Sequence, residues 1–152
     1  MADDTAMLEL IKRHSESHSK YVYFLLAATG ASLGYALQKI EGASFTWWTA
    51  PVVAALVSWL ASFYCGCRLI TATQTAISAN YIELQLKSGV HPKQPDHPQL
   101  LQAALDGTGT AMKSSLSRAS KYFDWQFGFL ALGVVLFIAW RLLDMLKATF
   151  AA

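Results

Sequence analysis

Charged side chains are scarce in this sequence. Asp, Glu, Lys and Arg make up 14% of its 152 residues and hydrophobic residues 54%, whereas soluble domains carry about 25% charged residues. The deficit is concentrated in residues 21–37, 47–67 and 125–140, which contain no acidic or basic side chain. Helices over these stretches would rise about 26, 31 and 24 Å, against roughly 30 Å of hydrocarbon in a bilayer. The sequence therefore predicts an all-α membrane protein with three transmembrane helices.

The absence of Asp, Glu, Lys, Arg and His from all three stretches also bears on function. Proton-coupled transport and ion pumping need ionisable groups within the membrane, so we expect neither. No nucleophile, general base and orienting acid stand at a recognisable spacing, and we expect no enzyme and no cofactor. The segment "GTGTAMKSS" has Met112 where a phosphate-binding loop needs glycine, and no strand precedes it.

Metal ligands are few as well. Cys65 and Cys67, the only cysteines, are two residues apart and would lie on nearly opposite faces of a helix, which fits packing residues and not joint chelation. His14 and His18 share one helical face. With the histidines of the 89–98 linker they are the weak candidates for a zinc site, but "HSESH" lacks the HExxH pattern. We expect solvated histidines and no metal.

The distribution of Lys and Arg predicts the orientation in the membrane. Nine of them lie before the first span or between the second and the third, and three lie on the other side. By the positive-inside rule the N-terminus is cytoplasmic and the C-terminus external. The predicted segments are a cytoplasmic amphipathic helix (1–20), three transmembrane helices (21–40, 47–67 and 122–143), a cytoplasmic helical segment (68–121) with a proline-rich linker (89–98), and an external tail (144–152).

Helix breakers divide the cytoplasmic segment. Gly89 is expected to end the helix that continues from the second span, and the prolines at 92, 95 and 98 keep the linker extended. A short helix over 99–106 is expected next. The "GTGT" at 107–110 should interrupt it, with Thr110 as the N-cap of the helix that leads into the third span.

Small residues recur every four positions in the first two spans. In lipid, helices associate by close packing, which small side chains permit. This pattern predicts either packing of the two spans within one chain or packing between chains. The residues are Gly30 and Gly34 in the first span and Ala54, Ser58, Ser62 and Gly66 in the second.

Hydroxyl groups also distinguish the spans. Residues 127–139 of the third span have no polar side chain, so this helix is expected to face lipid. Hydroxyls of the first two spans would either bond to carbonyls of their own helix or line a pathway. The candidates for a pore lining are Thr29, Ser32, Ser58 and Ser62.

Two further sets belong to the predicted cytoplasmic region. Ile70, Ile77 and Leu84 recur every seven residues and predict the seam of a helical stalk. Three basic residues precede the third span and are expected to contact anionic lipid headgroups. They are Lys113, Arg118 and Lys121.

Two classes of function remain. The first is a homo-oligomeric pore or membrane-perturbing effector in a bacterial inner membrane, regulated by a cytoplasmic protein or nucleotide signal. The alternative is a non-catalytic accessory or scaffold subunit of a larger membrane complex. In its helix order over residues 21–86, the chain resembles the SLATT class of small anti-phage effectors, in which two membrane helices join a helical cytoplasmic extension. The third span departs from that plan. The resemblance implies signal-triggered membrane disruption. Independently of it, we expect the partners to be lipid and further copies of the chain, and we expect no nucleic acid.

Overall fold

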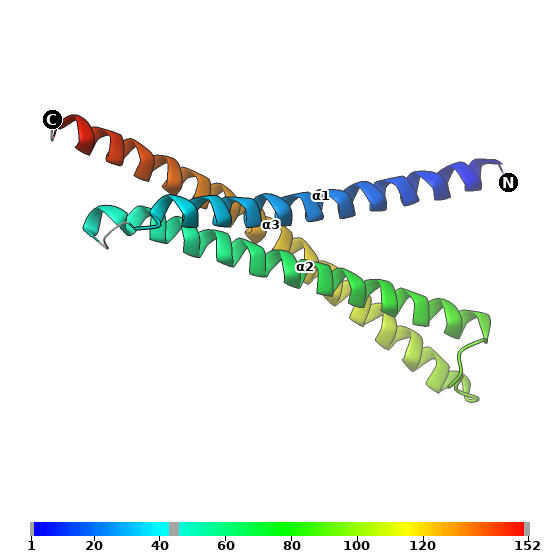
Figure 1. Ribbon diagram of the computed structural model, residues 1–152. Coiled ribbons are helices and arrows are strands. Elements are labelled where there is room, and N and C mark those ends of the chain that lie inside the picture. Colours follow the sequence, from blue (N-terminus) through cyan, green and yellow to red (C-terminus); the bar gives the residue numbers. More distant parts are fainter. Residues whose placement is uncertain (1, 43–45, 151–152) are drawn as a thin grey trace. The chain divides into compact units, whose positions relative to one another are not determined.

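The computed structural model describes residues 2–42 and 46–150; the side chains of most residues before Ser19, and those of Ala148 and Phe150, lie outside the description. The described chain is built from α1 (Ala2–Ile40), the short 3-10 helix η1 (Trp47–Thr49), α2 (Ala50–Ser88) and α3 (Pro98–Phe150) (Figure 1). These ranges contain no strand. The predicted all-α class and its three long helices are confirmed.

Local chemistry fixes where the helices begin and end. After α1, Gly42 adopts a φ of +76°, which a residue with a Cβ rarely takes. The Thr49 hydroxyl donates to the Thr46 carbonyl at 2.6 Å and accepts the Thr46 N–H at 3.2 Å, which caps the start of η1. Pro51 lies in the first turn of α2, where a missing N–H costs nothing.

Gly89 ends α2 as predicted. Its φ is +72°, its N–H donates to the Leu86 carbonyl at 3.3 Å, and the N–H of Val90 donates to the Gln85 carbonyl at 3.1 Å. This pair of bonds is a Schellman motif, which satisfies carbonyls that the last helical turn leaves open. The connection then runs from Gly89 to His97, whose Nδ1 accepts the Gln99 N–H at 3.3 Å at the start of α3.

The predicted interruption at 107–110 is wrong. The helix of α3 runs through Gly107, Thr108, Gly109 and Thr110 without a break, so the short helix 99–106 is its first part and Thr110 is no N-cap. Each interior glycine costs about 1 kcal/mol relative to alanine. Residues with high helix propensity on both sides offset this cost, and the backbone hydrogen bonds of the helix continue. The Thr108 hydroxyl donates to the Leu105 carbonyl at 2.9 Å.

The chain forms two compact units, through both of which α2 and α3 pass. Unit 1 comprises Met1–Gly66 and Gln126–Ala152, and unit 2 comprises Cys67–Trp125. Unit 2 thus nearly coincides with the segment 68–121 predicted to be cytoplasmic, and unit 1 holds nearly all of the three predicted spans.

The core of unit 1 joins all three long helices. Ala36 of α1 and Ala55 and Trp59 of α2 are buried at its centre. Side chains of α1, α2 and α3 pack around them: Leu33, Leu56, Leu130, Leu136 and Phe137. Small residues at the centre let the helices come close enough for the large ones to surround them.

Two of the described helices are long and apolar enough to cross a membrane, namely those in Trp47–Ser88 and Pro98–Lys147. The described part of α1 is not among the helices that are apolar enough by this measure. Of the three predicted spans, length and composition therefore select the second and third.

Candidate functional site

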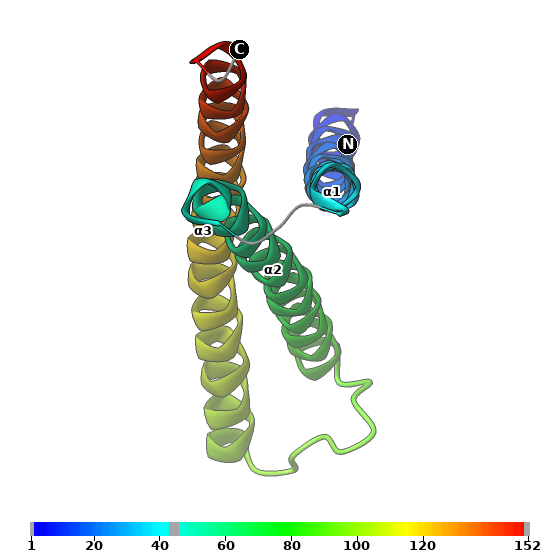
Figure 2. The same cartoon turned by 60° about the vertical axis from the view of Figure 1, so that its left-hand side comes forward.

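In unit 2, α2 and α3 run antiparallel and meet through small side chains. Ala76 and Ala79 of α2 are buried, as are Ser115 and Ala119 of α3. The two ribbons draw apart toward the 89–97 connection (Figure 2). Two cavities lie between these helices, and they differ in size and charge.

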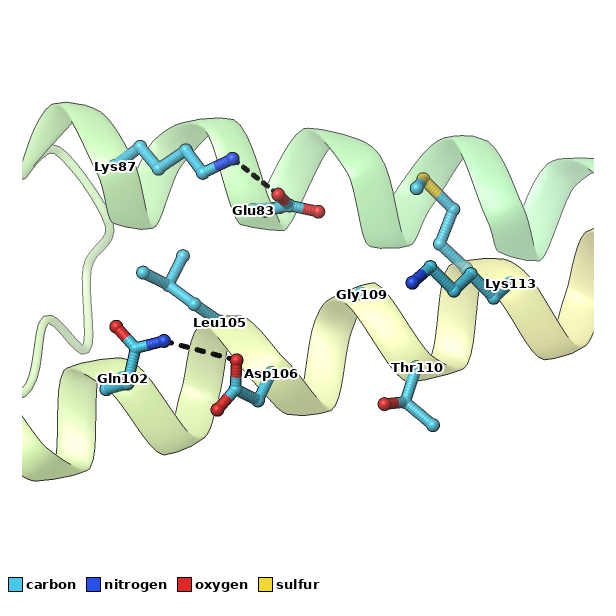
Figure 3. Close-up of a pocket in the computed structure, with 9 residues that line it drawn as sticks. Glu83, Lys87, Gln102, Leu105, Asp106, Gly109, Thr110 and Lys113 are labelled. Carbon is cyan, nitrogen blue, oxygen red and sulfur yellow. Dashed lines mark hydrogen bonds and ion pairs between the residues drawn. The ribbon is translucent and has the colours of Figure 1, made fainter.

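The larger cavity measures about 630 Å³. Figure 3 shows Leu105 and Lys113 extending into the space between the ribbons, while Thr110 points away from α2. Acidic and basic groups are equal in number along its wall, two of each, and within it Lys87 pairs with Glu83 at 2.6 Å. The charges balance, so this cavity has no preference for one sign. Its lining residues are Glu83, Lys87, Gln102, Leu105, Asp106, Gly109, Thr110, Met112 and Lys113.

The smaller cavity, of about 80 Å³, is basic and rich in hydroxyls. The Arg68 guanidinium of α2 lies over the ring of Tyr122, 5.8 Å from its centroid. From α3, Arg118 Nη2 donates to the Ser115 Oγ at 3.4 Å. The wall is completed by Thr71, Ala72 and Thr75.

The three basic residues predicted to contact lipid are separated by these cavities. Arg118 lines the smaller cavity and Lys113 the larger. Lys121 is exposed and lines neither. Arg68, which contributed only to the predicted orientation, lines the same cavity as Arg118. The two residues lie on facing turns of α2 and α3.

The small-residue stripes have two different environments. Ser58, Ser62 and Gly66 are buried in unit 1, whereas Gly30, Gly34 and Ala54 are exposed. A Cβ added to Gly66 would lie 2.6 Å from Leu26 Cδ2, so α1 approaches α2 closely there. A Cβ added to Gly30 or Gly34 would meet nothing within 4 Å. The second stripe packs within the chain from Ser58 to Gly66, whereas its first residue, Ala54, and the GxxxG of α1 do not.

Two of the four hydroxyls predicted to line a pore are bonded inside the chain. Thr29 donates to the Leu25 carbonyl of its own helix at 2.7 Å, and Ser62 donates to the Gln126 carbonyl of α3 at 2.8 Å. Ser58 is buried, and Ser32 is half-buried. Thr29 thus follows the back-bonding interpretation, and Ser62 joins two helices.

The predicted seam of the stalk is not buried within the chain. Ile77 and Leu84 are 62% and 58% exposed, and Ile70 is half-buried. The buried line along the same part of α2 consists of Leu69, Ala76, Ala79 and Leu86. Ile77 and Leu84 thus lie on a different face of α2 from the one that meets α3.

No group of three metal-ligating side chains occurs among the residues that the structure describes. The side chains of His14 and His18 lie outside the described residues. Cys65 is buried and Cys67 exposed, which fits their predicted placement on opposite faces, but only Cys65 packs within the chain as we predicted for both.

Sequence reasoning missed two features of unit 1. Trp59 packs against Gly133, where an added Cβ would lie 2.8 Å from the indole Cε2, and its Nε1 donates to the Leu130 carbonyl at 3.3 Å. The Gln126 side chain is fully buried, and neither its oxygen nor its nitrogen has a hydrogen-bond partner in the described structure. A tryptophan in mid-span and a glutamine at the start of a span were the available signals.

Comparison with known proteins adds no relative: no family model, no curated protein and no solved structure matches this chain.

Proposed function

We propose that this chain is a non-catalytic integral membrane protein whose copies associate through α1, and that the assembly forms a pore or otherwise perturbs the membrane. The observation that best supports this proposal is the exposed face of α1 that holds Gly30 and Gly34. Unit 2 would be the regulatory region, and its larger cavity has the size of pockets that hold small molecules, about 300 to 1,000 Å³.

The exposure of α3 supports insertion into a membrane. Only 11% of its most apolar window is buried inside the chain, against 39% for α2. A helix from the core of a soluble protein would be mostly covered. Lipid is the cover that a bare apolar helix of this length requires. Its large exposed apolar residues in unit 1 include Phe127, Leu132, Val134, Val135 and Ile138.

For the orientation we propose a cytoplasmic N-terminus, an external C-terminus and three spans, in a bacterial inner membrane. Reporters active on opposite sides of the membrane, fused to Ala152, test this arrangement. We expect only the reporter for the external side to be active, because nine basic residues flank the spans on one side and three on the other. A cytoplasmic signal from this fusion would contradict the three-span arrangement.

The case for association rests on the two faces of α1. One face is buried in unit 1 through Val22, Leu25 and Ala36. The other exposes Gly30 and Gly34 with open space around them. A helix of another chain can pack closely against glycines, which makes protein the better cover.

Replacing Gly34 with isoleucine should therefore dissociate the assembly. A branched side chain would stand where two backbones approach, and overpacking costs about 1 to 3 kcal/mol at each contact. Gly128→Ile is the matched control, since Gly128 of α3 is also exposed, helical and free of neighbours within 4 Å of an added Cβ. The mass of the detergent-solubilised protein and crosslinking in membranes report association.

We expect the control to keep the wild-type mass and Gly34→Ile to lower it. Leakage of dye from liposomes, if the assembly conducts, should disappear with the same variant. Wild-type protein that is monomeric in every detergent and leaves liposomes sealed would contradict the proposal and favour an accessory subunit. Equal loss of association in both variants would also contradict it, because the contact would not be specific to α1.

A further inference from the structure

We infer that the smaller cavity of unit 2 binds the phosphate group of an anionic lipid in the cytoplasmic leaflet. This inference rests on the membrane insertion proposed above, but not on association between chains. It replaces a general basic patch by a defined site formed by α2 and α3.

The charges of the cavity favour an anion. Arg68 and Arg118 approach it from different helices, and no acidic residue is among its described lining residues. Each guanidinium group carries a positive charge, which attracts a phosphate. Guanidinium groups also match the geometry of phosphate oxygens, which they bind through paired N–H donors.

Neighbouring side chains of unit 2 orient both guanidinium groups. The Tyr122 ring lies beneath Arg68, at 5.8 Å from its centroid. Ser115 is 1% exposed. Its Oγ accepts a hydrogen bond from Arg118 Nη2 at 3.4 Å. Accepting this bond leaves the Ser115 hydroxyl proton for a further acceptor. A phosphate oxygen in the cavity would be such an acceptor.

Size and charge discriminate between the two cavities. About 80 Å³ holds a phosphate group but falls well short of the roughly 300 Å³ that small-molecule sites begin with. The larger cavity has room for a bigger anion, but its two acidic and two basic side chains balance, so it does not favour an anion over a cation. The chemistry therefore favours a phosphate that belongs to a larger molecule lying outside the cavity.

The position of the cavity in the sequence points to lipid. Arg68 directly follows the predicted span 47–67, and Tyr122 is the first residue of the predicted span 122–143. Both therefore belong at the level of the cytoplasmic headgroups, where anionic lipids attract basic residues. Lys113 and Lys121 carry charge in the same region but lie outside this cavity.

Native mass spectrometry of the full chain in detergent tests the inference. Phosphatidylglycerol is titrated against phosphatidylcholine with the same acyl chains, and the lipids retained per chain are counted. We expect one phosphatidylglycerol to be retained preferentially. Removing one guanidinium that donates to the phosphate should weaken binding by roughly tenfold, so Arg68→Gln with Arg118→Gln should weaken it about a hundredfold.

Two controls separate the site from general attraction. Lys113→Gln with Lys121→Gln removes the same charge and should leave the affinity within about twofold. Arg68→Lys keeps the charge but removes the planar fork, and it should weaken binding by roughly tenfold. Equal weakening by the two double variants, or no effect of Arg68→Lys, would overturn the inference.

A further arm identifies the source of the phosphate. Inorganic phosphate at millimolar concentration should not displace the lipid, and its displacement of the lipid would assign the cavity to free phosphate and overturn the lipid assignment. Alkaline carbonate that extracts the protein from membranes would contradict insertion itself. Protein that stays embedded but retains phosphatidylglycerol equally in the arginine variants would overturn this inference alone.

Discussion

Replacing Gly133 with leucine is expected to lower the unfolding midpoint of unit 1 more than any other substitution of a single small residue. A Cβ at this position would lie 2.8 Å from Cε2 of Trp59 and 2.5 Å from its Cδ1. The indole cannot easily retreat, because it donates to the Leu130 carbonyl and packs against Phe137 with ring centroids 5.7 Å apart. With three more carbons to place, the cost should be about 3 kcal/mol or more, at the upper end of overpacking penalties.

Unfolding in detergent by sodium dodecyl sulfate, followed by circular dichroism, measures this destabilisation. Gly128→Leu is the control, since the same change five residues away meets no atom within 4 Å of the new Cβ, and its midpoint should stay close to the wild type. Gly133→Ala combined with Trp59→Phe should cost less than the sum of the two single changes, because the smaller ring makes room. Additive costs would mean that Trp59 and Gly133 do not press on one another.

Replacing Gln126 with methionine is expected to have the opposite sign and to stabilise unit 1. The glutamine side chain is fully buried, and both of its polar atoms lack partners in the described structure. A buried unsatisfied polar group costs about 1 to 3 kcal/mol. Methionine has a similar shape and no such group, and the Ser62 hydroxyl keeps its bond, because that bond goes to the backbone carbonyl of residue 126.

The midpoint of the same unfolding transition should rise by an amount that corresponds to about 1 kcal/mol or more. Gln99→Met, at an exposed position of α3, should leave it unchanged. A fall in the midpoint of Gln126→Met would show that the buried amide has a partner that stabilises it, such as a buried water.

Much of the fold follows from the sequence because the signals are local. Uncharged stretches predict the long helices, and a glycine after Ser88 predicts the end of α2 from the preferred φ of a single residue. The predicted interruption at 107–110 was wrong because it rested on the low helix propensity of the two glycines alone and not on the residues around them. Two glycines lower the stability of a helix by about 2 kcal/mol, which is too little to break one that has strong helix formers on both sides.

The packing of the helices was only partly predictable, since it depends on which residues face one another across helices. The GxxxG formed by Gly30 and Gly34 was the most visible pattern, yet the close approaches within the chain occur at single glycines. Gly66 faces Leu26 and Gln126, and Gly133 faces Trp59. A contact between one glycine and one large side chain does not recur at a fixed spacing in the sequence. Gly66 was found because it belongs to a regularly spaced stripe of small residues, whereas Gly133 belongs to none.

The smaller cavity was half predictable for a similar reason. Arg118 was selected because it stands among basic residues before a span. Arg68 is a lone arginine after a span and had no local pattern to mark it. Only the antiparallel pairing of α2 with α3 places it beside Arg118, and a sequence read in one direction does not reveal which turns of two long helices are level.

Because unit 1 is assembled from two separate parts of the chain, its core has a fixed order of completion on the ribosome. The indole of Trp59 and its acceptor at Leu130 are 71 residues apart. At roughly 5 to 20 residues per second, the first two helices wait about 4 to 14 seconds for the third. During that interval the Trp59 indole N–H lacks the carbonyl to which it donates in the complete unit. A chaperone or insertion factor that shields this part of α2 is expected to act before the third helix is made, and not after.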